Sequence, residues 1–230
     1  MTGKQLIFDL PLRQSQGRED YYVAQANALA LAMLDTPESW TSGRMILTGD
    51  AGAGKTHLAQ IWADANRAPL IPAAELQNYD APWLATAGAI VVDDANHIAG
   101  TRERESLLFH LCNLCQAEGV KLLLTARTAP RDWGLVVPDL RSRMEATTSA
   151  KIMPPDDALL AAVLVKMFAD RQIHVPVTLI PWLVSRMDRS LATARALVAA
   201  LDARSLSEKR AITRSLASDV LDSLGLHEED

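Results

Sequence analysis

Short apolar runs alternate along the chain with longer segments of mixed polarity. Four runs are apolar at nearly every position, as in strands buried on both faces of a sheet, and they begin at Met45, Leu70, Ala89 and Val120. The segments between them carry apolar residues at three- and four-residue steps, the spacing of a helix with one buried face. Strands that alternate with helices of this length predict an α/β fold with a parallel sheet covered on both sides.

The bounds of the expected elements follow from the same pattern. Strands are expected at residues 45–48, 70–71, 89–92, 120–125 and 147–152. Helices are expected from Asp20 to the residues before Pro37, at 57–66, at 101–118 and, as a short turn, at 140–144. The buried face of the 101–118 helix is predicted to consist of Leu107, Leu108, Leu111, Leu114 and Cys115.

The pattern changes at Pro154-Pro155-Asp156, beyond which the apolar spacing is helical throughout. Helices are expected at 156–171, 179–187, 191–204 and 208–224, with Asp156 as an N-cap and Gly225 as a C-cap. At the other end, Pro11 argues against a helix near the N-terminus. The expected organisation is an extended arm at 1–19, an α/β domain at 20–153, a small all-helical domain at 154–226 and an acidic tail at 227–230.

A glycine-rich loop joins the strand at 45–48 to the helix that follows. Its sequence, Gly49-Asp50-Ala51-Gly52-Ala53-Gly54-Lys55-Thr56, has the glycines and the Lys-Thr pair of a P-loop. Such a loop directs backbone N–H groups and a helix dipole at one anion. Lys55 would reach the outer phosphates of a nucleotide, and the Thr56 hydroxyl would bind Mg²⁺. The residues predicted to contact or border the nucleotide are Gly49, Gly52, Ala53, Gly54, Lys55, Thr56 and His57, with His57 as a packing residue.

Two carboxylates, Asp93 and Asp94, follow the most apolar of the runs. Ligands of open parallel sheets gather at the carboxyl ends of the strands, so Asp93 is predicted to bind Mg²⁺ together with Thr56. Asp94 is predicted to orient the attacking water, although a short carboxylate polarises water poorly. The alternative is that both acids lie in a solvated loop.

Thr125 ends the next strand and would face the γ-phosphate, but a threonine at a strand end is also ordinary. Two arginines, Arg141 and Arg143, lie on the short turn before the last strand. A guanidinium that reaches a neighbouring subunit's γ-phosphate stabilises transition-state charge. On the residues alone, a surface helix with solvated arginines is the competing interpretation.

Composition and charge exclude several classes of protein. Hydrophobic residues make up 49% and charged residues 22% of the 230-residue chain, as in a soluble globular protein. A net charge of −5 argues against a basic domain that binds duplex DNA. No run is long enough for a membrane span, and no signal-peptide layout opens the chain. Two cysteines fit a reducing compartment, so we expect a cytoplasmic protein.

The first residues have apolar positions at alternate places, at Leu6, Phe8 and Leu10, after a polar Gln5. An extended peptide of this kind presents its anchors to one side and suits a groove on a partner. It suits equally well an edge strand on its own domain, so both interpretations stay open at this point.

Taken together, the motifs resemble the DnaA-related branch of the AAA+ ATPases. The resemblance rests on Gly54-Lys55-Thr56-His57-Leu58, on Asp93-Asp94, on Leu124 to Pro130, on Leu140-Arg141-Ser142-Arg143 and on the Pro154-Pro155-Asp156 boundary. It implies an AAA+ P-loop domain with a five-stranded parallel sheet, a helical lid domain, and ADP or ATP with Mg²⁺ as cofactors. DnaA continues into a helix-turn-helix DNA-binding domain, and this sequence stops at Asp230, so we expect that domain to be absent.

A DnaA-like core with an N-terminal Gln-Leu-x-Phe-x-Leu arm resembles the Hda-type regulatory inactivators of DnaA. The resemblance implies that Gln5, Leu6, Phe8 and Leu10 bind the DNA polymerase sliding clamp. It also implies that Arg143 is an arginine finger acting in trans on DnaA–ATP, with Arg141 as its supporting neighbour. Contact with DNA would then be mainly indirect, through the clamp, and a nucleotide-dependent homo-oligomer is a further expectation.

One position departs from the family pattern. DnaA-like lids carry a phosphate-sensing arginine early in the third lid helix, and here that position falls at Ala192. Arg189 and Arg195 lie near it in the sequence without occupying it. Loss of this guanidinium should weaken both discrimination for ATP and self-hydrolysis. The alternatives to an Hda-type regulator are an independent ATPase that remodels a replication protein and an adaptor in which nucleotide only stabilises the fold.

Overall fold

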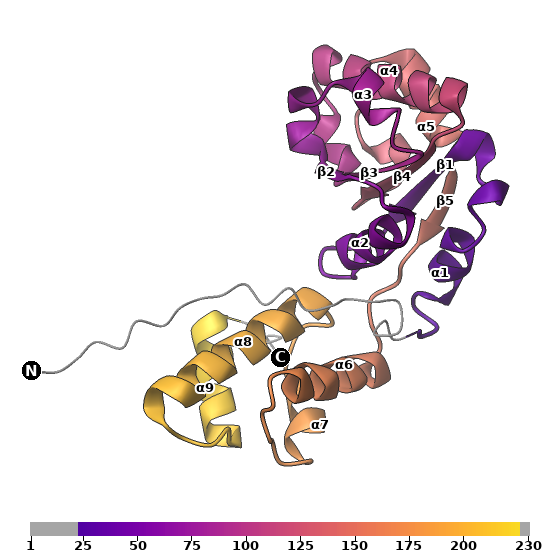
Figure 1. The fold of residues 1–230 in the computed structure, drawn as a ribbon. Coiled ribbons are helices and arrows are strands. Elements are labelled where there is room, and N and C mark those ends of the chain that lie inside the picture. The colour runs from indigo at the N-terminus through magenta and orange to yellow at the C-terminus, as the bar shows by residue number, and fades with distance from the viewer. Residues whose placement is uncertain (1–22, 226–230) are drawn as a thin grey trace, which may run out of the picture.

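Five parallel strands form the centre of the part of the chain that this computed structural model describes, residues 23–225 (Figure 1). The strands are β1 (Arg44–Thr48), β2 (Leu70–Pro72), β3 (Ala89–Asp93), β4 (Lys121–Ala126) and β5 (Thr148–Lys151). They lie in the order β2-β3-β4-β1-β5, with every neighbouring pair parallel. The five-stranded parallel sheet expected from the apolar runs is confirmed.

Helices cover both faces of the sheet (Figure 1). The helices are α1 (Ala28–Leu34), α2 (Lys55–Asn66), α3 (Ala81–Leu84), α4 (Arg102–Glu118) and α5 (Pro138–Glu145). Short 3-10 turns lie between them at η2 (Pro37–Ser39), η3 (Thr41–Gly43), η4 (Ala73–Asn78), η5 (Ala95–Ile98) and η6 (Pro130–Asp132). Side chains alternate across β1, so Met45 and Leu47 pack with α1 and α2, whereas Ile46 packs with α4 and α5.

Four helices follow the sheet and enclose a separate apolar core. They are α6 (Asp157–Asp170), α7 (Leu179–Val184), α8 (Leu191–Glu208) and α9 (Arg214–Leu224). Phe168, Leu183 and Leu201 are among the side chains buried there. The expected N-cap is confirmed, because Asp156 accepts a hydrogen bond of 2.8 Å from the Leu159 N–H, and Gly225 ends α9 with a φ of +61°. Below, α6 to α9 are called the lid.

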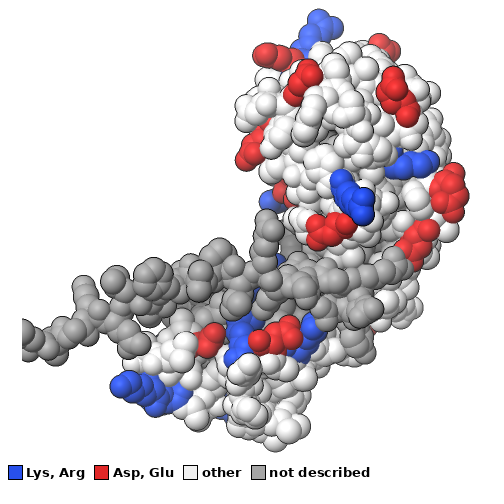
Figure 2. Space-filling model, in the orientation of Figure 1, with Lys and Arg blue, Asp and Glu red and all other residues white. Residues whose placement is uncertain are grey.

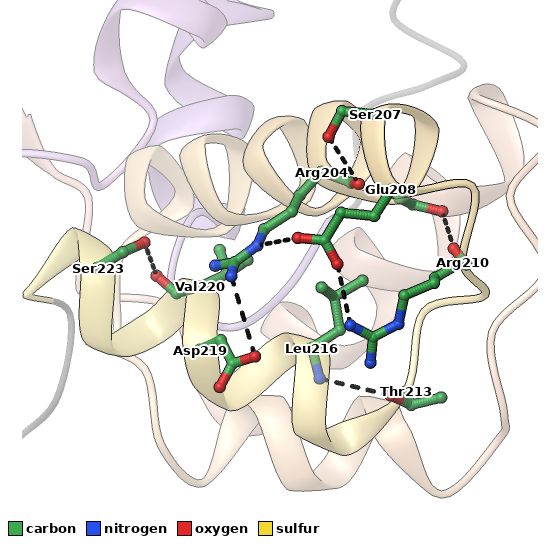
Figure 3. Close-up of polar contacts among 10 residues, drawn as sticks. Arg204, Ser207, Glu208, Arg210, Thr213, Leu216, Asp219, Val220 and Ser223 are labelled. Carbon is green, nitrogen blue, oxygen red and sulfur yellow. Dashed lines mark hydrogen bonds and ion pairs between the residues drawn. The ribbon is translucent and has the colours of Figure 1, made fainter.

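A charged network joins α8 to α9 (Figure 3). Arg204 lies 2.8 Å from Glu208 and 4.0 Å from Asp219 of α9. Arg210, in the connection between the helices, lies 3.0 Å from Glu208. The hydrogen bond from Arg204 lowers the pKa of the Glu208 carboxyl. Because these groups are exposed, the network orients α9 more than it stabilises the lid.

Several predicted helix ends are wrong. The first helix begins at Ala28 and not at Asp20, because residues 24–27 form a turn in which Asn27 accepts from the Ala24 N–H. The helix expected at 191–204 continues to Glu208, and α9 begins only at Arg214. The chain reverses at Lys209, which has a φ of +52°. The helix expected at 179–187 ends at Val184.

The predicted buried face of α4 is only partly right. Leu108, Leu111 and Cys115 are buried, but Leu107 and Leu114 are half-buried. Their places are taken by two residues outside the predicted face, Glu105 and Cys112. The face is therefore rotated toward α5 and the start of β1, where Cys112 packs.

Candidate nucleotide site

The glycine-rich loop lies between the end of β1 and the start of α2. Gly52 and Gly54 have φ values of +76° and +98°, which favour glycine at both positions. Gly54 is the N-cap of the 12-residue helix α2, so the free N–H groups of its first turn face the loop. The backbone therefore has the form of an anion-binding loop at a helix N-terminus.

Lys55 lies over this loop. It is 6% exposed, and its Nζ donates to the carbonyl oxygens of Gly49 at 2.9 Å and of Asp50 at 3.0 Å. Burial lowers the pKa of Lys55, with Arg127 acting in the same direction, and the nearby Asp93 and Asp94 oppose the shift. The ammonium is thus held where the outer phosphates of a P-loop nucleotide lie.

The start of α2 and the ends of β3 and β4 are joined through the side chain of Asp93. The Thr56 hydroxyl donates to its carboxylate at 3.0 and 3.2 Å. The Thr125 hydroxyl donates to Asp93 Oδ1 at 2.5 Å and accepts from the Asp94 N–H at 2.8 Å. Thr125 is fully buried, so its hydroxyl anchors Asp93 and Asp94 to the core of the sheet. Asp94 itself turns the chain with a φ of +53°.

Thr56 and Asp93 suit Mg²⁺, which prefers oxygen ligands and keeps some of its water and substrate oxygens. A hydroxyl and a carboxylate 3.0 Å apart can share one ion or its water shell. Within residues 23–225, no cluster of three or more His, Cys, Asp or Glu side chains could hold a metal without a nucleotide. A Mg²⁺ ion held by Thr56 and Asp93 would therefore take its remaining ligands from the phosphates of a bound nucleotide and from water.

The N-terminal end of α8 rests directly on the P-loop. The Leu191 N–H donates to the Gly52 carbonyl oxygen at 2.9 Å. A Cβ atom at Gly52 would lie 2.0 Å from Ser190 Oγ and 3.4 Å from Ala192 Cβ. The sequence-predicted sensor position is thus in contact with the phosphate-binding loop, and it carries a methyl group there.

The two arginines near Ala192 have other neighbours. Arg189 forms an ion pair of 3.0 Å with Asp157 within the lid. Arg195 lies close enough to His57 that its charge, after burial, lowers the pKa of the imidazole. His57 is half-buried, in keeping with the expected packing role.

Arg143 lies at the end of the sheet opposite the P-loop, where the strands begin. Its guanidinium lies 4.7 Å from the centre of the Phe109 ring, and it donates to the Asn113 side chain. Because α5 ends at Glu145, just before the start of β5, Arg143 is near the edge where the strands begin. The five residues of β1 span about 16 Å between that edge and the P-loop. Arg143 therefore cannot reach the phosphates at its own P-loop, and Arg141 is exposed beside it.

Glu105 fixes the start of the helix that carries these arginines. It is fully buried and accepts hydrogen bonds from the Val137 N–H at 2.7 Å, the Val136 N–H at 2.9 Å and the Gly100 N–H at 2.9 Å. Val137 is the N-cap of α5. The carboxylate thus joins α4 to α5 through three backbone N–H donors.

Sequence reasoning missed the residues that position the predicted ones. Phe109 and Asn113 are four residues apart on α4, which places them on one face, but nothing in the sequence linked that face to Arg143. Glu105 was missed because an acidic residue in the first turn of a helix is ordinarily exposed. Gln5, Leu6, Phe8 and Leu10 lie outside the described residues, as does the tail at 227–230.

Comparison with known structures identifies the fold. Domain III of the DnaA replication initiation protein from Thermotoga maritima superposes with a TM-score of 0.80, over 93% of this chain and 98% of that domain, at 18% identity. The chain has the fold of DnaA domain III. DnaA from Aquifex aeolicus bound to AMPPCP superposes with a TM-score of 0.67, over 82% of this chain and 65% of that one, at 16% identity.

Sequence comparison points to the same group of proteins at low identity. DnaA of Flavobacterium psychrophilum is 21% identical over 95% of the chain, and DnaA of Thermomicrobium roseum is 26% identical over 85%. The chain spans about half the length of these relatives, 51% and 46%. No protein-family model matches it. In the described part of the chain, none of the helices combines the length and apolarity needed to cross a membrane.

Proposed function

We propose that the chain binds ADP or ATP with Mg²⁺ at the P-loop. The proposal is supported by the positions of Lys55, Thr56 and Asp93 at one end of the sheet. Related DnaA structures contain AMPPCP. When bound, Mg²⁺ would offset phosphate charge, while Thr56 and Asp93 would hold it and Asp94 would face the attacking water. The neutral Ala192 beside Gly52 supports weak turnover of the chain's own nucleotide.

We further propose that the protein is a cytoplasmic negative regulator of replication initiation, which stimulates hydrolysis of ATP bound to DnaA. The observation that carries this proposal is the position of Arg143, held by two neutral side chains at the sheet edge remote from its own P-loop. An arginine finger needs this combination: a guanidinium whose charge no carboxylate neutralises, at a place that another subunit can approach.

The N-terminal arm completes the proposed function. Gln5, Leu6, Phe8 and Leu10 would bind the sliding clamp, so that contact with DNA is mainly indirect. A tether of this kind converts a weak encounter with DnaA into one at high local concentration. Nucleotide would also favour association of the chain with DnaA or with a second copy of itself, because the lid rests on the P-loop.

The test is hydrolysis of DnaA–ATP in the presence of clamp-loaded DNA. Arg143→Ala should lower the stimulated rate by a factor of about 10³ or more and leave nucleotide binding by the chain itself intact. Arg141→Ala, two residues away and exposed, removes the same charge from the supporting neighbour and should lower the stimulated rate less than Arg143→Ala does. A Gln5→Ala/Leu6→Ala variant should lose clamp binding and stimulation together. Full stimulation by Arg143→Ala would exclude the proposed role.

One alternative has an observation in its favour. Asp93, Thr56 and Thr125 form a complete hydrogen-bonded group at the P-loop, which an independent ATPase acting on a replication protein would need. That function predicts turnover by the purified chain without DnaA and its loss in Asp93→Asn. A nucleotide-stabilised adaptor predicts that neither Asp93 nor Arg143 affects hydrolysis by a partner.

A further inference from the structure

Arg44, the first residue of β1, has a guanidinium in an unusual environment. The residue is 5% exposed, although arginine is seldom fully buried without a partner. Its NH1 group donates to Gln116 Oε1 at 3.3 Å, and its Nε has no hydrogen-bond partner. Within residues 23–225, no carboxylate lies within ion-pair distance of Arg44. A positive charge is therefore buried among neutral groups.

The surroundings of Arg44 leave this charge uncompensated. Burial raises the pKa of the Cys112 thiol to about 11 and that of Cys115 to about 12, so both are uncharged near neutral pH. Burial also lowers the pKa of Arg44, and the charge of Arg143 lowers it further. The ionised group that acts on Arg44 is thus a second guanidinium of the same sign.

Both guanidiniums are held by one face of α4. Asn113 and Phe109 hold Arg143, and Gln116 holds Arg44. The three α4 residues are spaced at i, i+4 and i+7, which places them along a single stripe of the helix. The stripe supplies a ring face and amide oxygens, and no carboxylate, so it orients two cations without neutralising either one.

Packing alone does not account for Arg44. A methionine of similar length would fill the same space without a buried charge, and replacing buried ions by apolar residues is often neutral or stabilising. The orphaned Nε and the like charge of Arg143 both disfavour the folded chain on its own. An anion that approaches Arg143 would offset the repulsion between the two guanidiniums.

We propose that Arg44 is a positioning residue for Arg143, whose buried charge raises the positive potential at that guanidinium and so favours a multiply charged phosphate group over a single carboxylate. This inference rests on the proposed function, in which the phosphates belong to the nucleotide of DnaA. Arg44 touches no ligand itself. It acts through the low-dielectric interior, where a charge is screened less than it is at the surface.

The experiment compares Arg44→Met with Arg44→Lys and with Lys121→Met. Lys121 begins β4 at the same sheet edge and is half-buried, so its variant removes the same charge at a matched place. Arg44→Met should raise the melting temperature by about 2–4 °C, the shift expected for a domain of this size when one unfavourable group is removed. In the DnaA–ATP assay it should raise the concentration for half-maximal stimulation on the order of tenfold, with little change in the maximal rate.

Arg44→Lys keeps the charge and should stay close to wild type in the half-maximal concentration, and Lys121→Met should do the same. A melting temperature that falls in Arg44→Met would assign the residue to folding and overturn the proposal. Unchanged half-maximal stimulation would overturn it as well. Arg143→Ala, measured in the same assay, distinguishes failure of the proposed function from failure of this inference. Full stimulation by Arg143→Ala would reject the proposed function. Reduced stimulation by Arg143→Ala together with normal stimulation by Arg44→Met would reject only the inference about Arg44.

Discussion

At the scale of single residues, the candidate site depends on side chains that hold other residues of the site in place. Thr125 is the clearest case. The sequence predicts that its hydroxyl faces the γ-phosphate, and the structure places that hydroxyl against Asp93 and the Asp94 N–H. It is the link between the two acidic residues and the core of the sheet.

Thr125→Val should therefore reduce both stability and nucleotide binding. The change leaves the Asp94 N–H without its partner and removes one of the two hydrogen bonds that Asp93 Oδ1 accepts, and an unpaired buried group costs about 1–3 kcal/mol. Urea unfolding and Mg²⁺-dependent binding of a fluorescent ADP measure the two effects. Thr86→Val, which alters an exposed hydroxyl bonded to the Trp83 carbonyl oxygen, is the control. Equal losses in the two variants would contradict the role of Thr125.

The chemistry at the P-loop was predictable from local sequence, because Lys55 and Thr56 follow the loop directly and the chain leaves them little freedom. The partners of Arg143 were not. Asn113 meets Arg143 across 30 residues of sequence, and only the packing of α4 against α5 brings them together. Contacts of this kind follow from tertiary structure and leave no local pattern.

At the scale of elements, the strands were easier to predict than the helix ends. The apolar runs at β1, β3 and β4 occur because both faces of these strands are buried. The end of α8 carries no such signal, since Lys209 adopts the left-handed conformation that glycine usually provides. The late start of α1 was hard to predict for another reason. The turn before it, in which Asn27 accepts from the Ala24 N–H, has the same residue spacing as a helical turn.

The contact between α8 and the P-loop makes Gly52 critical for nucleotide release. In Gly52→Ala the new Cβ would lie 2.0 Å from Ser190 Oγ, so α8 must move away from the loop. We expect ADP to dissociate at least about tenfold faster, because loss of the Leu191–Gly52 hydrogen bond and its packing exceeds about 1.4 kcal/mol. Stopped-flow release of a fluorescent ADP measures this rate.

Gly88→Ala is the matched control for this prediction. Gly88 has a φ of +70°, close to the +76° of Gly52, but a Cβ there would meet nothing within 4 Å. Both variants carry the backbone strain of a left-handed alanine, and only one of them displaces the lid. Similar ADP release from the two would show that strain, and not the lid contact, sets the rate.

At the scale of the whole molecule, the lid meets the α/β domain at the P-loop. The sheet has an apolar core on each face and the lid has its own, and the lid reaches the P-loop through Leu191 and approaches α2 through Arg195. Charged side chains of both signs are scattered over the face shown in Figure 2, without a broad patch of one sign over the sheet.

The lowered pKa of His57 makes the stability of the folded chain sensitive to pH. Burial first and Arg195 second lower its pKa below the usual value of 6.5, so the folded chain holds the proton less tightly than the unfolded chain does. The resulting stabilisation is complete above about pH 6.5 and is lost as the pH falls through the lower, folded value. Urea midpoints should thus decrease between pH 7.5 and pH 5.5, and His57→Gln should remove part of that decrease. His110→Gln, on the exposed side of α4, should leave the wild-type dependence in place; an identical pH dependence in His57→Gln would show that this imidazole does not couple the lid to α2.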